Sequence, residues 1–221
     1  KLLGKLFSLF FFNSSIVIQD GRILDILPSA DAKNSYTCDS SHVYNHHIVM
    51  PGLINTHTHA AMALFRGLAN DLHLMDWLQN HIWPAEQKWV DDDFVQIGTQ
   101  LAVAEMIRGG VTCFNDMYFF AETTAKVVAK TGIRGHIGMI LLDFPTQYAN
   151  DPDEYFSKGL ALHDQYKSHP LIKCTFAPHA PYTVSNASLE RVATLANELE
   201  LPVHIHLHET RDEIALSIEQ H

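Results

Sequence analysis

The chain of 221 residues lacks several features, and each absence argues against a class of protein. Its three cysteines, Cys38, Cys113 and Cys174, form no CxxC pair and are odd in number, so we expect reduced thiols in the cytoplasm rather than a disulfide framework. Positive charge is scarce as well, because 15 Lys and Arg residues face 25 Asp and Glu residues. This acidic balance disfavours nucleic acid or an anionic membrane as the main partner, and a small molecule is the expected one.

Long hydrophobic segments are also missing. No apolar stretch approaches the ~20 residues that a membrane-spanning helix needs. The short apolar run at residues 6–12 is faintly similar to a signal peptide, but no small-x-small cleavage site follows it, so we expect no export signal there. Hydrophobic residues make up 47% of the chain, which suits one large globular domain or one domain with a smaller companion.

The pattern along the chain predicts an α/β fold. Residues 14–27 contain two short strands around Asp20-Gly21, a strong hairpin signal, and residues 28–47 are polar and irregular. From residue 48 on, strand-like and helix-like segments alternate, which indicates parallel βα units. The predicted helix near residues 92–108 has the usual signals at both ends, because aspartates precede it as N-cap candidates and Gly109-Gly110 ends it.

We count about five such units, with strands that start near residues 53, 111, 133, 172 and 203. Five units fit either a doubly wound sheet or the first part of an eight-stranded barrel. No GxGxxG sequence follows the first strand, which weakens the dinucleotide-binding version of the doubly wound sheet.

Two histidines mark the end of the first predicted strand of this region. His57 and His59 are two residues apart, so their side chains point the same way if the segment is extended. Imidazoles in this arrangement can bind one metal ion, although a pair of satisfied histidines at a strand end explains the motif equally well.

A second group of histidines ends the fifth predicted strand and strengthens the metal interpretation. His204, His206 and His208 share one face, and Glu209 follows where the strand should give way to a loop. Burying neutral imidazoles without partners costs free energy, so packing alone is a poor explanation for two such strand ends. We expect His206 to be the metal ligand of the three, with His204 deeper and His208 at the rim.

His179 is a weaker candidate at the end of the fourth predicted strand. Pro178 and Pro181 flank it and fix the backbone there. It is either a group that binds substrate or supports the metal ligands, or a loop histidine with no role.

At this point several motifs resemble one family. They are "PGLINTHTHAAMALFRGL", "WLQNHIWPAE", "FNDMYFF", "LDFPT", "FAPHAPYT" and "HIHLHET". The chain is similar to the amidohydrolase superfamily, and most similar to its branch of 5-methylthioadenosine/S-adenosylhomocysteine deaminases. The similarity is nearly continuous from about residue 48 to residue 221.

The resemblance implies a (β/α)8 barrel, of which residues 51–221 would form the first part. Residues 1–50 would contribute to a small β-sandwich. One divalent metal ion, usually zinc, would be held by His57, His59 and His206. The family also needs a histidine on strand six and an aspartate on strand eight, which we expect beyond residue 221, so the chain resembles the front part of an enzyme.

The resemblance also implies the reaction and its residues. The family hydrolyses the amino group from an adenine base, and Glu209 would transfer protons as a general acid and base. Trp77 would cover the 5′ group of the nucleoside, Glu86 would accept hydrogen bonds from the ribose hydroxyls, and His179 would donate to a purine nitrogen. A purely structural explanation exists for three of these residues. Glu209 could be a charge at a helix N-terminus, Trp77 could belong to an amphipathic helix face, and Glu86 could be a solvated charge.

One feature of the sequence narrows the expected substrate. Some members of the branch bind the homocysteine carboxylate with arginines, but residues 138–156 contain none. We therefore favour 5′-methylthioadenosine or adenosine over S-adenosylhomocysteine. The alternatives are a related deaminase or chlorohydrolase for guanine, a pterin or a triazine, and a non-catalytic fragment. The resemblance also allows a homo-oligomer, and we expect this chain alone to have weak activity or none.

Overall fold

The computed structural model describes residues 11–220 of the chain. Its contacts divide the chain into two compact units, one up to Met50 and the other from Pro51 onward. The assignment of residues 1–50 to part of a small β-sandwich domain, separate from the domain of residues 51–221, stays a prediction. The apolar run at residues 6–12, for which we expected no export role, lies mostly outside the described residues.

The first unit is a hairpin followed by a short helix. Strands β1 (Ser14–Gln19) and β2 (Arg22–Pro28) pair antiparallel around Asp20 and Gly21, whose positive φ angles of 51° and 73° suit a two-residue hairpin turn. Helix α2 (Ser29–Ser35) then occupies part of the segment that we expected to be irregular. It buries only Ala32 and has no side-chain cap, so neither of the usual sequence signals announces it.

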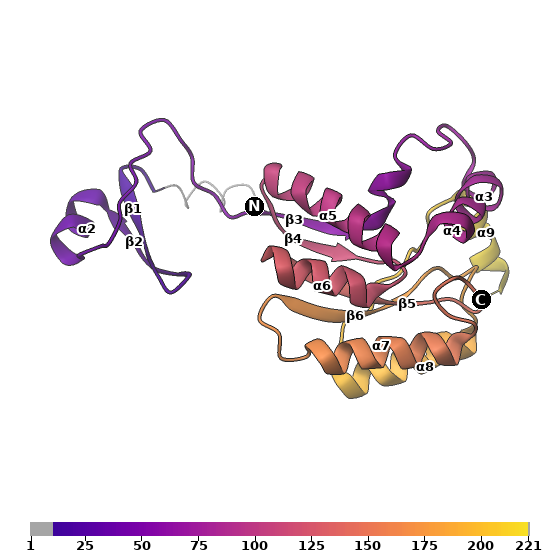
Figure 1. The fold of residues 1–221 in the computed structure, drawn as a ribbon. Coiled ribbons are helices and arrows are strands. Elements are labelled where there is room, and N and C mark those ends of the chain that lie inside the picture. Colours follow the sequence, from indigo (N-terminus) through magenta and orange to yellow (C-terminus); the bar gives the residue numbers. More distant parts are fainter. Residues whose placement is uncertain (1–10, 221) are drawn as a thin grey trace. The chain divides into compact units, whose positions relative to one another are not determined.

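The second unit contains a four-stranded parallel sheet (Figure 1). Its strands are β3 (Leu53–Thr58), β4 (Val111–Asp116), β5 (Arg134–Leu141) and β6 (Ile172–Pro178). The helices that follow or connect them are α5 (Asp92–Arg108), α6 (Ala121–Thr131), α7 (Pro152–Tyr166), α8 (Asn186–Leu199) and α9 (Arg211–Gln220). The first crossover also carries the 3₁₀ helix η2 (Ala60–Phe65), α3 (Leu74–Trp77), the π-helical turn η3 (Leu78–Ile82) and α4 (Trp83–Trp89).

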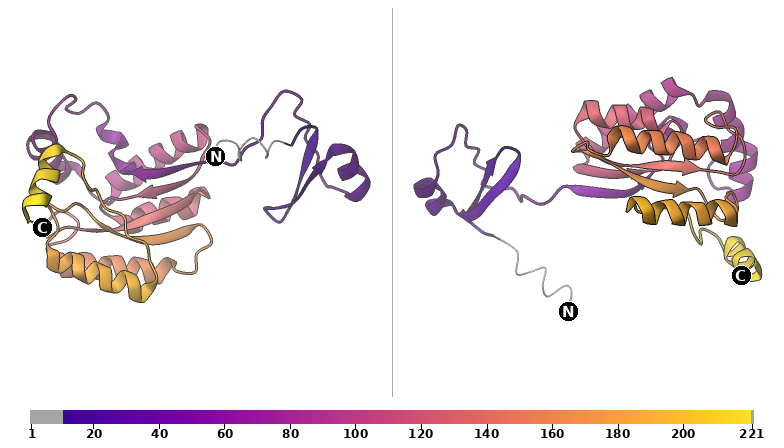
Figure 2. Two further views of the ribbon diagram at one scale, coloured as in Figure 1. Left: turned by 180° about the vertical axis from the view of Figure 1, so that it is seen from behind. Right: turned by 90° about the horizontal axis from the view of Figure 1, so that it is seen from below.

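The strand order decides between the two predicted architectures. The order in the sheet, β3-β4-β5-β6, follows the order in the chain. A doubly wound sheet reverses its strand order part-way, whereas a barrel adds each strand beside the previous one. The second unit therefore has the topology of a partial (β/α)8 barrel, with α5, α6 and α7 packed along one face of the strands (Figures 1 and 2).

The main core lies between these strands and helices. Buried side chains from all of these layers meet there, among them Phe114, Val128, Ile137, Tyr155 and Ile172. A second, smaller cluster joins η2 to α5 around Ala61 and Val95. Caps at the helix ends match the sequence signals, since the Asp91 side chain accepts from the Phe94 N–H at 2.8 Å and α5 ends at Gly109.

The fifth predicted strand is wrong as a regular strand. Residues 201–210 form only one bridge, between Phe176 and Val203. The Phe176 N–H donates to Pro202 O, and the His204 N–H donates to Phe176 O, as in a parallel ladder. The next donor on β6 would be Pro178, which has no N–H, and the His206 N–H bonds instead to His179 O. The missing donor interrupts the ladder and leaves an extended but irregular segment.

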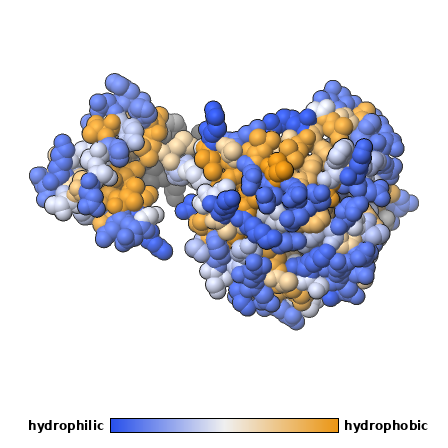
Figure 3. Space-filling model, in the orientation of Figure 1, coloured by the Kyte–Doolittle hydropathy of each residue, from blue (hydrophilic) through white to orange (hydrophobic). Residues whose placement is uncertain are grey.

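The apolar residues around residue 53 predict a buried strand, and this prediction is also wrong. β3 is an edge strand of the described sheet, and Leu53 and Ile54 are 49% and 66% exposed. The apolar residues of this strand are exposed, so the apolar pattern alone did not predict its burial correctly. Other exposed apolar side chains, including Ile97 and Leu101, lie on α5, where apolar surface is visible in Figure 3. No helix in residues 11–220 is both long enough and apolar enough to cross a membrane.

Candidate metal centre

Three imidazoles converge where the strands of the second unit end. His57 lies on β3, His59 directly follows that strand, and His206 lies on the irregular segment beyond β6. The carboxyl ends of parallel strands lie at the same edge of a sheet, so residues distant in sequence meet there. The Nε2 atom of His206 is 3.2 Å from Nε2 of His57 and 3.2 Å from Nε2 of His59.

Backbone carbonyls determine which nitrogen carries the proton in two of the rings. The Nδ1 atom of His59 is 2.5 Å from Met117 O, and Nδ1 of His206 is 2.8 Å from His179 O. A carbonyl oxygen only accepts hydrogen bonds, so each Nδ1 must be the protonated nitrogen. The two Nε2 atoms, 3.2 Å apart, therefore point their lone pairs toward each other when both rings carry only the Nδ1 proton, which is the arrangement that a shared metal ion favours.

A metal ion fits this arrangement better than a proton. Burial lowers the pKa of His57 and His59 to about 4, so both rings are neutral at physiological pH. The three ligand atoms lie within 4.8 Å of one another. Zinc–nitrogen bonds of ~2.0–2.1 Å in a tetrahedral site put two ligand nitrogens roughly 3.3 Å apart, close to the two distances of 3.2 Å from Nε2 of His206.

A buried carboxylate fixes the backbone around the first two histidines. Asp116, 2% exposed, accepts hydrogen bonds from Thr58 Oγ1 and from the Ala60 N–H, both at 2.7 Å. Burial raises the pKa of this carboxyl to about 6 even though both hydrogen bonds favour its charged form. Because Thr58 and Ala60 flank His59, these bonds hold the end of β3 in place.

His179 lies beside the cluster and is joined to it by its own backbone and ring. Its ring centroid is 5.0 Å from that of His206, and its Nδ1 is 2.8 Å from Thr183 Oγ1. The Thr183 hydroxyl donates to Ala180 O at 3.1 Å, so its oxygen is the acceptor for the His179 Nδ1–H. Burial lowers the pKa of His179 to about 3, and the neutral ring therefore has a lone pair on Nε2.

Glu209 is held next to His179 by Tyr182 and by its own turn. The Tyr182 hydroxyl donates to Glu209 Oε2 at 3.0 Å, and the Tyr182 ring packs edge-on to the His179 ring. The preceding residue, His208, has a left-handed φ of 59°. The carboxylate of Glu213, 5% exposed, accepts from the N–H groups of His208 and Glu209 at 2.8 and 2.7 Å and so stabilises this turn.

Glu86 reaches the cluster through a tyrosine. It lies on α4 and accepts a hydrogen bond from the Tyr118 hydroxyl at 2.8 Å, and the Tyr118 ring centroid is 6.2 Å from that of His59. Burial raises the pKa of Glu86 to about 7, against the opposing effect of the tyrosine hydrogen bond. Trp77 lies half-buried at the end of α3, and in the described part of the chain no hydrogen bond or ring contact joins it to the cluster.

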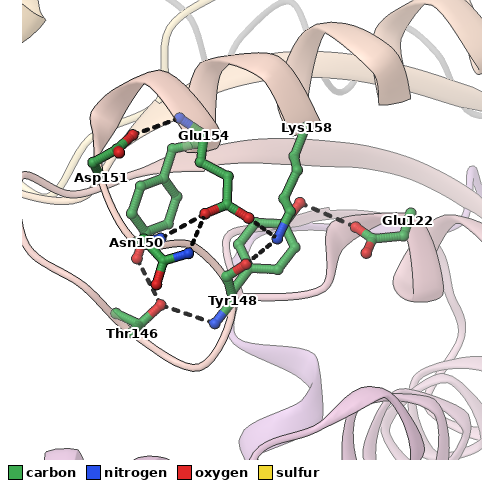
Figure 4. Close-up of polar contacts among 8 residues, drawn as sticks. Glu122, Thr146, Tyr148, Asn150, Asp151, Glu154 and Lys158 are labelled. Atoms are coloured by element: carbon green, nitrogen blue, oxygen red, sulfur yellow. Dashed lines mark hydrogen bonds and ion pairs between the residues drawn. The ribbon is translucent and has the colours of Figure 1, made fainter.

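The loop after β5 is fixed by a polar network (Figure 4). Lys158 forms an ion pair with Glu154 at 2.8 Å, donates to Tyr148 O, and lies 4.6 Å from the centre of the Tyr148 ring. The Tyr148 hydroxyl donates to Glu122 at 3.0 Å. The loop reaches α4 as well, because the Gln147 side chain donates to Gln87 O at 2.8 Å.

The comparisons with known proteins agree with this arrangement. The model of the amidohydrolase family matches residues 48–221, which is most of the chain. The chain belongs to the amidohydrolase family. The 5-methylthioadenosine/S-adenosylhomocysteine deaminases of Saccharophagus degradans and Teredinibacter turnerae are 52% and 50% identical over 204 and 210 residues, or 92% and 95% of this chain. The resemblance seen in the motifs is thereby confirmed.

The solved structures agree on the fold of this amidohydrolase. An adenosine deaminase from Xanthomonas campestris with bound zinc superimposes with a TM-score of 0.92 and 47% identity over 95% of this chain. A guanine deaminase from C. acetobutylicum, 24% identical with a TM-score of 0.80, shares the fold. The chain spans about half the length of these proteins: 46% and 48% of the two curated relatives and 48% of the Xanthomonas chain.

The structure brings together the three histidines that the sequence singled out, and His179 lies beside them. The roles of these residues and of Glu209 stay predictions. The sequence did not identify the tyrosines that connect the carboxylates to the cluster, nor Asp116 and Glu213. These residue types are common in cores and loops, and only the pairing of distant segments gives them a role. A weak signal existed for Glu213, because Thr210 and Glu213 have the Thr-x-x-Glu spacing of a helix N-terminus.

Proposed function

We propose that this amidohydrolase removes the amino group from adenine nucleosides by hydrolysis, with His57, His59 and His206 holding one zinc ion. The observation that carries the proposal is the convergence of three imidazole nitrogens, with Nε2 of His57 and Nε2 of His59 each 3.2 Å from Nε2 of His206. The names of the relatives support the reaction, since they are deaminases of adenine nucleosides. When bound, the ion supplies Lewis acidity that makes water a nucleophile at neutral pH.

Glu209 is the proposed proton carrier. Tyr182 donates to its Oε2, which leaves Oε1 to accept a proton from the attacking water. The carboxyl then delivers that proton to a ring nitrogen of the purine, as a general acid and base. Overall, water adds at C6 and ammonia leaves, giving the inosine analogue.

His179 is proposed to bind the base as an acceptor. The resemblance led us to expect that it donates to a purine nitrogen. Its proton is on Nδ1, where Thr183 accepts it, and the lowered pKa opposes a second proton on Nε2. We therefore assign Nε2 as an acceptor for an N–H or O–H group of the bound nucleoside.

Glu86 and Trp77 are the proposed contacts of the sugar and its 5′ group. Tyr118 occupies Oε1 of Glu86, so Oε2 is available to accept from a ribose hydroxyl. Trp77 offers an indole face for an apolar 5′ substituent, and its contact with substrate rests on family resemblance alone.

A neutral 5′ group fits this chain best. Lys158 follows the segment that carries arginines in some relatives, and it is already paired with Glu154 and packed on Tyr148 (Figure 4). A carboxylate on the substrate would therefore find no free cation there. This supports 5′-methylthioadenosine or adenosine over S-adenosylhomocysteine.

The cysteines support the proposed cytoplasmic location. All three are unpaired, with Cys38 exposed, Cys113 half-buried and Cys174 buried. Free thiols of this kind persist in a reducing compartment. A nucleoside is the proposed small-molecule partner.

The proposal is tested with metal analysis and turnover of the 221-residue chain. We expect one zinc per chain. Because the chain alone is expected to be weakly active at most, we expect only slow ammonia release, from 5′-methylthioadenosine and adenosine in preference to S-adenosylhomocysteine and guanine. His206→Ala should lose both metal and turnover. Glu209→Gln should keep the metal and lose this slow turnover, since general acid–base catalysis contributes about 10²–10⁴-fold. Glu190→Gln, an exposed glutamate on α8, is the matched control and should change neither.

Two outcomes would contradict the proposal. A chain that binds no zinc and releases no ammonia from any of these substrates would support the non-catalytic alternative. Preferential turnover of guanine or a triazine would support the other deaminase or chlorohydrolase reaction.

A further inference from the structure

The three clustered histidines are not anchored in the same way. In His59 and His206, Nδ1 donates to a backbone carbonyl. A backbone acceptor is present whatever side chain that residue carries. In His57, Nδ1 is instead 3.0 Å from Nε2 of the His204 side chain. The orientation of one cluster histidine thus depends on the identity of a residue outside the cluster.

The hydrogen bond between these rings has two possible directions, and only one suits a metal ligand. If Nδ1 of His57 donates to Nε2 of His204, the lone pair of His57 Nε2 faces His206. If His204 donates instead, the proton of the neutral His57 ring moves to Nε2, and this atom can no longer bind a metal. Metal binding at His57 Nε2 therefore requires His204 to be the acceptor, with its own proton on Nδ1.

This requirement has a visible cost at His204. Its Nδ1 is buried and has no hydrogen-bond partner among the described residues. A buried polar atom without a partner destabilises a fold, because it loses its hydrogen bonds to water and gains none in the protein. A leucine would fill similar space without this cost, but it could not accept the His57 proton. The position therefore sacrifices stability for an acceptor at Nε2.

We propose that His204 is a positioning residue of the metal site. It accepts the Nδ1–H of His57 and thereby holds Nε2 of His57 toward the ion. Its role matches the general arrangement in which a metal-binding histidine donates its other N–H to a nearby acceptor. The inference rests on the proposed metal site, and it adds a residue for which the sequence predicted only a deeper position.

The test compares cobalt and zinc binding by the full chain and three variants. His204→Leu removes the acceptor, and His204→Gln places an amide oxygen near the position of Nε2. His136→Leu is the matched control, because His136 lies exposed on β5 of the same sheet and has no contact with the cluster among the described residues. We expect His204→Leu to weaken cobalt affinity by about 10–100-fold and to alter the visible absorption of bound cobalt. His204→Gln should restore most of the cobalt affinity and most of the visible absorption. His136→Leu should bind cobalt like the unchanged chain.

A measurement on the unchanged chain complements the variants and does not depend on their folding. Long-range ¹H–¹⁵N spectra of the zinc-loaded protein should show protons on Nδ1 in both His57 and His204. A proton on Nε2 of His204 would overturn the inference. Equal metal affinity of His204→Leu and the unchanged chain would also overturn it, as would equal losses in the Leu and Gln variants. In each of these cases the unchanged chain still binds metal, whereas failure of the unchanged chain to bind would remove the proposed function itself.

Discussion

β3 and β5 belong to the same parallel sheet, but they differ in burial and in what they carry. β5 is covered by α6 and α7, and six of its eight residues are buried. β3 has no buried residue, yet it carries His57 and leads into His59. The difference indicates that the stability of the second unit comes from its central strands, whereas the candidate site uses a strand whose apolar side chains contribute little. Substitutions should therefore separate stability from metal binding.

Ile137→Ala on β5 should have the largest effect on stability. Ile137 is 1% exposed in the main core, and such truncations cost about 2–5 kcal/mol because they lose apolar contact and leave a cavity. Urea unfolding of the metal-free chain measures the loss. Zinc affinity of the folded protein should stay within about twofold of the unchanged chain, since the Ile137 side chain packs in the main core and makes none of the hydrogen bonds that orient the three histidines. A change below about 1 kcal/mol would show that β5 is not the stabilising strand.

Glu86→Gln should change how stability depends on pH. The folded-state pKa of Glu86 is raised from 4.5 to about 7, so the folded protein keeps a proton that the unfolded chain releases. This contribution to stability is complete below about pH 4.5 and is lost as the pH rises through 7. Glutamine keeps an acceptor for Tyr118 without a charge. The difference in unfolding free energy between the two proteins should shift by on the order of 3 kcal/mol between pH 4.5 and 8, in favour of the glutamine variant at high pH.

A constant difference between the unchanged chain and the Glu86→Gln variant across this range would contradict the raised pKa. Each protein should be measured without metal by chemical denaturation at several pH values. The other titrating groups are shared, so their contributions cancel in the comparison.

Gly98→Ala tests whether the packing of α5 against η2 affects both stability and metal binding. A Cβ at Gly98 would lie 2.9 Å from Ala61 Cα and press on the Ala61 carbonyl, in the turn that follows His59. Alanine is the better helix former by about 1 kcal/mol, but overpacking against backbone costs about 1–3 kcal/mol and should exceed it. We expect net destabilisation together with weaker zinc binding, measured by thermal unfolding and zinc titration. Gln96→Ala, an exposed position on α5, should be neutral or stabilising.

Ile54→Ala on β3 should have the smallest effect and is the direct counterpart of Ile137→Ala. Ile54 is 66% exposed, so the same truncation removes little buried surface and should cost below about 1 kcal/mol in urea unfolding. A loss comparable to that at Ile137 would mean that β3 is covered in solution and would remove the contrast between the strands.

The sequence predicted the parts of this fold that local chemistry determines. Asp91 and Gly109 marked the ends of α5, Asp20-Gly21 marked the hairpin, and the spacing of His57 and His59 placed both rings on one side. It failed where a neighbouring segment decides the outcome. Residues 201–210 have a strand-like pattern, but their pairing depends on Pro178, which lies on another strand and offers no N–H. The proton positions in the cluster likewise depend on carbonyls of Met117 and His179, which no side-chain motif encodes.

The π-helical turn η3 separates Trp77 on α3 from Glu86 on α4. Such a turn contains one more residue than an α-helical turn, and each residue advances a helix by about 100° around its axis. The number of residues between Trp77 and Glu86 thus determines the direction of the Trp77 indole relative to the Glu86 carboxyl. Removing a single residue from Leu78–Ile82 would leave both side chains intact but would rotate the indole of Trp77 by about a quarter-turn around the helix axis relative to Glu86.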